Sequence, residues 1–167
     1  MKLSPSATSK VIIAAERILL VLWVGGLWIV GYMVAPMLFH ILEDRRLAGE
    51  IAGRLFSVMN YIGLACGTAL LLSVLYQAGQ QWRRSWRAGA LLAMLILISI
   101  GQFGLQPMMQ ALKIAVPGGF VQGSAEAARF GMLHGVSSML FLITSLLGLV
   151  LVVCGFNRVE KAAASSE

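Results

Sequence analysis

Residues 130–157 read FGMLHGVSSMLFLITSLLGLVLVVCGFN and contain no charged side chain. A helix needs about 20 predominantly apolar residues to cross a lipid bilayer. Three other stretches, at residues 18–42, 55–82 and 88–112, are equally free of Asp, Glu, Lys and Arg. These stretches predict an all-α integral membrane protein, an antiparallel up-down four-helix bundle. We expect its spans at about residues 14–39, 52–77, 88–107 and 130–156.

The composition is that of a membrane protein. Of the 167 residues, 59% are hydrophobic and 12% are charged, whereas a soluble domain carries about 25% charged residues. Little sequence lies outside the spans, so residues 1–167 are expected to form one membrane domain. The net charge is +6, but basic residues at span ends meet anionic lipid and set orientation. The lipid bilayer is therefore the expected partner, and nucleic acid is not.

The basic residues also predict the orientation of the bundle. With four spans, both termini and the middle loop lie on one side, and that side carries eight of the 13 Lys and Arg residues. The middle loop, QQWRRSWR at residues 80–87, places three arginines beside two tryptophans. Because cytoplasmic loops are enriched in Lys and Arg, we expect both termini in the cytoplasm and the protein in the cell inner membrane.

Polar side chains within the spans gather in the halves that would then face outward, whereas the inner halves read as apolar. A polar side chain in hydrocarbon is costly, so it usually has a hydrogen-bond partner or a function. Helical spacing puts the three glutamines on one face of the third span, at i, i+4 and i+8. Stripes from all four helices could converge on an outward-facing pocket for a small ligand or a lipid headgroup. The candidate pocket residues are His40, Asn60, Gln102, Gln106, Gln110, His134 and Ser138. The alternative is interhelical hydrogen bonding, worth about 0.6 kcal/mol per pair on average.

A soft-metal site is a second interpretation of the outer halves, because thioether and imidazole ligands suit Cu(I). Its candidate ligands are Met33, Met37, His40 and His134. Met132 and Met139 do not share the face of His134, since both lie more than about 100° away around the helix. Methionine also fills gaps in apolar packing. No cofactor is required by the sequence, and no catalytic motif is recognisable in it.

Two further patterns predict specific contacts. Gly63 and Gly67 have the spacing of a close helix–helix contact, so they are candidate contacts for a second copy or for another membrane protein. Glu16 and Arg17 are expected to form an ion pair at the inner membrane surface.

Several short stretches of this sequence are similar to sequences of a known protein family. GGLW at 25–28, GYMVAPMLF at 31–39, AGEIAGRLF at 48–56 and LHGVSSM at 133–139 resemble an uncharacterised bacterial family, domain of unknown function 4149. That family is similar to eukaryotic transmembrane protein 205, and the resemblance covers about residues 14–155. It implies a four-helix membrane protein and supplies no mechanism. The eukaryotic members are associated with platinum resistance, which suits soft-metal handling.

A more distant similarity is to copper-resistance D domains and to the membrane haem-linked protoporphyrinogen oxidase. Those proteins have a histidine near the start of a comparable helix, where this chain has Glu16-Arg17. The sequence thus predicts a non-enzymatic membrane protein that binds a small ligand or soft metal, with a role in metal tolerance or transport. The alternatives are an accessory subunit of a larger membrane complex and a haem-linked redox protein.

Overall fold

The protein is all-α in a computed structural model that describes residues 7–78 and 85–154, and no strand occurs in these two ranges. Four helical rods long and apolar enough to cross a membrane are present, at Val11–Ile41, Arg45–Gln77, Trp86–Ala115 and Ala125–Cys154. The elements in chain order are α1 (Ala7–Trp28), η1 (Ile29–Val34), α2 (Ala35–Ile41), α3 (Arg45–Ala78), α4 (Trp86–Ser99), η3 (Ile100–Leu105), α5 (Gln106–Ala115) and α6 (Ala125–Cys154). The expected fold class is confirmed.

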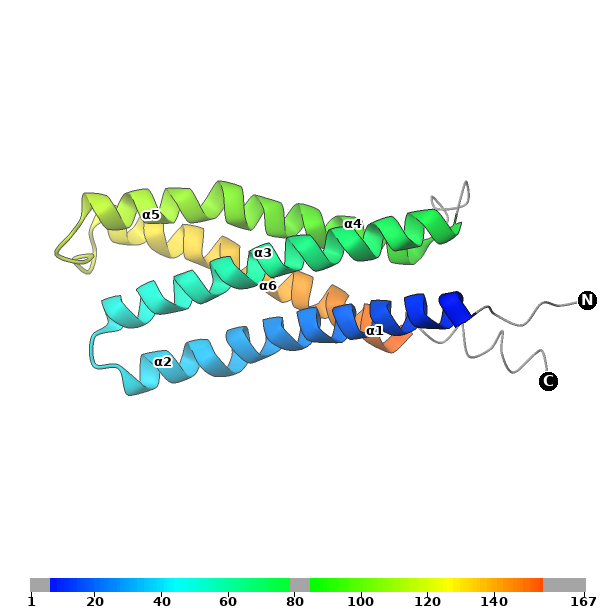
Figure 1. The fold of residues 1–167 in the computed structure, drawn as a ribbon. Coiled ribbons are helices and arrows are strands. Elements are labelled where there is room, and N and C mark those ends of the chain that lie inside the picture. The colour runs from blue at the N-terminus through cyan, green and yellow to red at the C-terminus, as the bar shows by residue number, and fades with distance from the viewer. Residues whose placement is uncertain (1–6, 79–84, 155–167) are drawn as a thin grey trace, which may run out of the picture.

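The rods form an up-down bundle in which α1 and α4 each pack against both α3 and α6. Figure 1 shows that α1 begins and α6 ends at one end of the bundle, which we call the terminal end. The α2–α3 turn and the α5–α6 connection lie at the other, which we call the turn end. Most of the arginine-rich middle loop, residues 79–84, lies outside the described residues.

Side-chain caps fix where two of the rods begin. The Asp44 carboxylate accepts hydrogen bonds from the backbone N–H groups of Arg46 (2.8 Å) and Leu47 (3.2 Å) at the start of α3. The Ser124 hydroxyl accepts one from the backbone N–H of Ala127 at 3.1 Å. Such caps satisfy the free N–H groups of a first helical turn. They start the second and fourth rods earlier than the expected spans at 52 and 130.

Two prolines explain the wide π-helical turns. Pro36 and Pro107 are the second residues of α2 and α5, directly after η1 and η3. Proline lacks an N–H, and its ring crowds the carbonyl four residues earlier. That carbonyl belongs to Tyr32 in η1 and to Phe103 in η3, so the wider π turn lies where the crowding occurs. The third rod therefore continues through Pro107 to Ala115, beyond the expected end at about residue 107.

The core is built around Trp23, whose side chain is 0% exposed. A Cβ added at Gly63 would lie 2.5 Å from Trp23 Nε1, and one added at Gly67 would lie 2.9 Å from Trp23 Cη2. Leu27, Met94 and Leu151 complete the buried centre. The glycine pair thus has the close contact that its spacing indicated, but with Trp23 of the same chain. It is not a free surface for a partner.

Large apolar side chains cover the outside of the bundle along its whole length. Val21, Leu72, Ile96 and Leu146, one from each rod, are all exposed. Such a surface is stable in lipid rather than in water. The chain is therefore a multi-pass membrane protein.

Candidate functional site

A line of polar contacts joins α3 to the η3–α5 segment in the half of the bundle next to the turn end, and we call it the polar seam. Asn60 Nδ2 donates to Gln102 Oε1 at 2.9 Å. Gln106 Nε2 donates to Ser57 Oγ at 3.1 Å and to Gly53 O at 3.3 Å. Further out, Lys113 Nζ donates to Gly49 O at 3.4 Å, and Arg46 Nη1 donates to Pro117 O.

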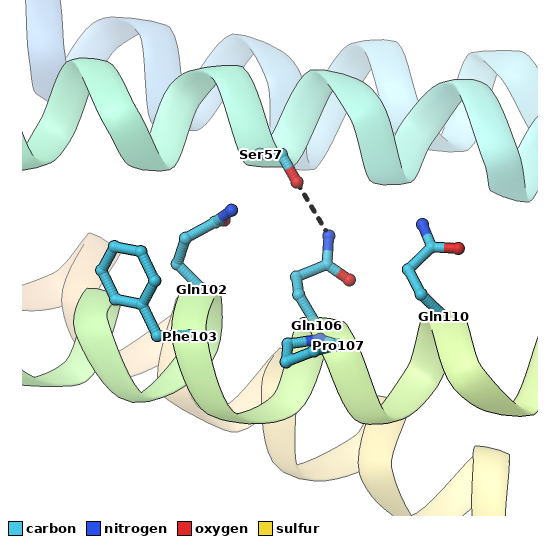
Figure 2. A pocket seen from close by; sticks show the side chains of 6 residues that line it. All are labelled: Ser57, Gln102, Phe103, Gln106, Pro107 and Gln110. Atoms are coloured by element: carbon cyan, nitrogen blue, oxygen red, sulfur yellow. Dashed lines mark hydrogen bonds between the residues drawn. The ribbon is translucent and has the colours of Figure 1, made fainter.

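The sequence builds the seam by opposing long side chains with short ones. Gln102, Gln106 and Gln110 lie four residues apart, so all three point from η3 and α5 toward α3, as Figure 2 shows. Gly53 and Ser57 occupy the facing side of α3. Since glycine has no side chain, its carbonyl oxygen can accept a second hydrogen bond from a long amide beside its own helical one. The predicted glutamine stripe thus faces another helix of the bundle.

An open groove with a volume of about 330 Å³ follows the seam. Its lining residues are Ser57, Gln102, Phe103, Gln106, Pro107 and Gln110. Gln102 is 9% exposed, Gln106 is half-buried and Gln110 is exposed. Among the described residues, the Gln110 amide has no hydrogen-bond partner, and Gln106 donates but accepts none. The groove therefore holds unused donor and acceptor capacity beside apolar carbon.

The groove ends inward at a closely packed floor. The Asn60–Gln102 pair is the innermost polar contact of the seam. One turn further along α3, Gly63 meets the Trp23 ring and the Ile98 side chain. Both side chains are buried, and the Trp23 Nε1–H has no hydrogen-bond partner among the described residues. Their close packing ends the groove toward the bundle centre. In the described part of the chain no polar path follows it through the bundle centre.

The remaining candidate residues do not reach this groove. His40 is exposed on α2, which packs against α3. His134 is exposed on α6, where its ring stacks on Phe130 with centroids 6.2 Å apart. Ser138 Oγ donates to the His134 carbonyl of its own helix at 2.9 Å. The groove is therefore lined by residues of α3, η3 and α5 only among the described residues, and a wider pocket that includes His40, His134 and Ser138 stays a prediction.

The candidate metal ligands are likewise not drawn together in the bundle core. Met33 and Met37 are exposed on the first rod, as is His40, while His134 lies on the fourth rod against Phe130. Within residues 7–78 and 85–154 no group of three or more His, Cys, Asp or Glu residues is placed to hold a metal ion.

A second polar cluster, near the terminal end, was not foreseen from the sequence. Glu16 is 5% exposed. Its Oε1 accepts hydrogen bonds from Ser73 Oγ (2.5 Å) and Gln77 Nε2 (2.6 Å), and its Oε2 pairs with Arg87 Nη2 at 3.5 Å. The inner halves of the spans are thus not wholly apolar. Glu16 was expected to pair with its neighbour Arg17, and the structure shows an ion pair of Glu16 with Arg87. The i, i+4 spacing of Ser73 and Gln77 was the available signal.

This cluster joins α1, α3 and α4 at their terminal ends. Both oxygens of the Glu16 carboxylate accept hydrogen bonds from the protein. A carboxylate is tolerated in a buried position when it is paired with an opposite charge and hydrogen-bonded, as Glu16 is. We therefore interpret the cluster as a structural contact, and the groove as the candidate site.

Comparison with known proteins identifies a family for this chain. The family model described as "Domain of unknown function (DUF4149)" matches residues 18–116. The matched region runs from α1 to just past α5 and contains both sides of the polar seam. Neither a curated protein nor a solved structure matches the chain, and the similarity to eukaryotic transmembrane protein 205 stays a prediction. Because its model covers more than half of the sequence, the chain belongs to the DUF4149 family.

Proposed function

We propose that the protein is a non-enzymatic inner-membrane protein that binds a small polar ligand in the groove between α3 and α5. Both termini are assigned to the cytoplasm by the distribution of Lys and Arg, so the groove opens to the outer side. The observation that carries the proposal is the unpartnered amide of Gln110, beside the free Oε1 of Gln106.

Interhelical hydrogen bonding accounts for part of the glutamine stripe. Gln102 is satisfied by Asn60, and the amino group of Gln106 is satisfied by α3. Gln110 has no such partner in the described residues. Polar side chains in membrane spans are costly and are often functional, so an amide near the hydrocarbon boundary that has no protein partner is a candidate ligand contact. Of the seven candidate residues, the proposed ligand site keeps Gln106 and Gln110, and it gains Ser57, which lines the groove.

The proposal does not extend to a soft metal, since the exposed Met33, Met37 and His40 do not share a site with His134 in the described structure. For the accessory-subunit alternative, the glycine pair that suggested it is occupied by Trp23. No contact among the described residues favours the haem-linked alternative.

The test is to identify what the groove retains. The protein is extracted in native-lipid particles, and co-purifying small molecules and lipids are quantified by mass spectrometry per mole of protein. The wild type and a Met108→Leu control, whose exchanged residue lies outside the groove lining, should retain one species in near-stoichiometric amount. Gln110→Leu should lose it. Identical small-molecule and lipid profiles for wild type and Gln110→Leu would refute ligand binding by the groove.

A further inference from the structure

We propose that the ligand of this groove is a single glycerophospholipid that enters sideways from the bilayer. Its acyl chain lies against Phe103, its ester oxygens meet the amides of Gln106 and Gln110, and its phosphate meets Lys113. This inference rests on the proposed function, because it names the class of molecule that the same groove holds.

The groove has a lipid-facing side wall. Phe103 lines it and is 61% exposed. Tyr61, which is 55% exposed on α3, meets Phe103 edge-on with ring centroids 6.4 Å apart. The aromatic pair belongs both to the groove region and to the apolar outer surface of the bundle. In a bilayer such a wall faces lipid tails, so an acyl chain can lie against it through close van der Waals packing.

The depth of the polar groups fits the layers of a bilayer. The rod Trp86–Ala115 has 30 residues and is about 45 Å long at about 1.5 Å per residue. The hydrocarbon core is about 30 Å thick, so a rod centred in the bilayer extends about 7 Å beyond it at each end. Gln110 then lies at the hydrocarbon boundary, where lipid esters lie. Lys113, about 4.5 Å further out along the helix, lies in the headgroup layer.

The chemistry of the side chains follows the same order. Neutral amide N–H groups can donate to ester oxygens, and an ammonium group can pair with a phosphate. Lys113 is half-buried and has one long hydrogen bond, 3.4 Å to Gly49 O, with its Nζ 5.7 Å from the Phe130 ring centroid. The neighbouring carboxylate of Glu50 is paired with Arg54 at 2.7 Å. Lys113 therefore keeps donor capacity for an anionic oxygen.

The order Phe103, Gln106, Gln110, Lys113 along the third rod thus repeats the order of acyl chain, ester and phosphate along a phospholipid. A free phosphate or a soluble glycerol phosphate would use Lys113 alone. A diacylglycerol would use the aromatic wall and the amides but not the ammonium group. Only the complete lipid engages the aromatic wall, the two amides and the ammonium group together.

The experiment uses the full chain, delipidated in mild detergent, with binding followed by native mass spectrometry. Three probes are compared: dioctanoyl phosphatidylglycerol, dioctanoylglycerol, which lacks the phosphate, and glycerol 3-phosphate, which lacks the acyl chains. We expect one phosphatidylglycerol per chain, about tenfold weaker binding of dioctanoylglycerol, and no binding of glycerol 3-phosphate. The tenfold step corresponds to the loss of one charge-assisted hydrogen bond.

Variants separate a specific site from surface lipid. Gln110→Leu and Lys113→Gln should each weaken phosphatidylglycerol binding about tenfold, and Lys113→Arg should retain it. The matched control is Arg129→Gln, which removes an exposed charge on α6, away from the seam. Thermal unfolding in the same detergent confirms that each variant is folded.

Each outcome decides the inference. Equal phosphatidylglycerol binding by wild type, Gln110→Leu and Lys113→Gln means non-specific lipid and overturns it. Glycerol 3-phosphate binding as tightly as phosphatidylglycerol also overturns it. If no probe binds but a water-soluble species co-purifies with the wild type and is lost from Gln110→Leu, the phospholipid inference fails and the proposed function stands. If no species depends on Gln110, both fail.

Discussion

Replacing Gly63 by alanine tests the packing of Trp23 at the centre of the bundle. The added methyl group would lie 2.5 Å from Trp23 Nε1, 3.1 Å from Trp23 Cε2 and 3.2 Å from Ile98 Cδ1. Both neighbours are buried, so the indole cannot move aside without disturbing the core. Such overpacking costs about 1–3 kcal/mol, and alanine recovers about 0.5–1 kcal/mol of helix propensity over glycine. We expect Gly63→Ala to lower the free energy of unfolding by about 1–2 kcal/mol.

Gly26 supplies a matched control for this substitution. A Cβ there would lie 2.6 Å from Met59 Cε, a contact equally short but with the flexible end of a side chain. Met59 can adopt another rotamer, so Gly26→Ala should be neutral or slightly stabilising. The assay is unfolding by sodium dodecyl sulfate in mixed micelles, followed by tryptophan fluorescence. Equal midpoints for Gly63→Ala and Gly26→Ala would refute the described position of Trp23 over α3.

Three further substitutions test individual polar contacts in the same unfolding assay. Glu16→Leu removes a buried carboxylate that accepts hydrogen bonds from Ser73 and Gln77 and should cost about 2–3 kcal/mol, so wild-type stability of this variant would contradict the terminal-end cluster. A double-mutant cycle of Asn60→Leu and Gln102→Leu should give a coupling energy of about 0.6 kcal/mol, whereas strictly additive losses would mean that the two amides do not meet. Tyr32→Phe removes a 2.9 Å hydrogen bond to a buried serine hydroxyl of α6 and should cost about 1 kcal/mol; an unchanged midpoint would place the Tyr32 hydroxyl elsewhere.

The fold was predictable because a bilayer leaves few options. Backbone polar groups in hydrocarbon must be satisfied within a helix or a closed barrel, so four charge-free stretches of this length lead to four helices. The rod ends were less predictable. They depend on the caps at Asp44 and Ser124 and on the π turns that accommodate Pro36 and Pro107, which a count of apolar residues does not register.

The glutamine side of the candidate site was predictable from helical spacing. The four-residue spacing of Gln102, Gln106 and Gln110 puts them on one face, and long amides in an apolar helix tend to find polar partners in the neighbouring helix. The facing residues were harder to identify, because Gly53 contributes a backbone carbonyl rather than a side chain.

The exposure of the other candidate polar residues was not predictable, because the burial of one helical face changes along the helix with the position of its neighbours. Residues 134 and 138 lie on the same face of α6 as Ser145 and Gly148, because 11 residues bring the helix back to within about 20°. That face is buried at Ser145 and Gly148 but exposed at residues 134 and 138. The Glu16–Arg87 pair joins residues 71 positions apart. No spacing within one helix could indicate that pair, since it depends on which helices become neighbours.

The most direct test of the ligand-binding groove is an experimental structure of the protein crystallised from a lipidic mesophase without delipidation. The central claim predicts continuous ligand density in the groove between α3 and α5, within hydrogen-bond distance of the Gln110 amide. A Gln110 side chain hydrogen-bonded to α3, with the groove closed and free of ordered density, would contradict it.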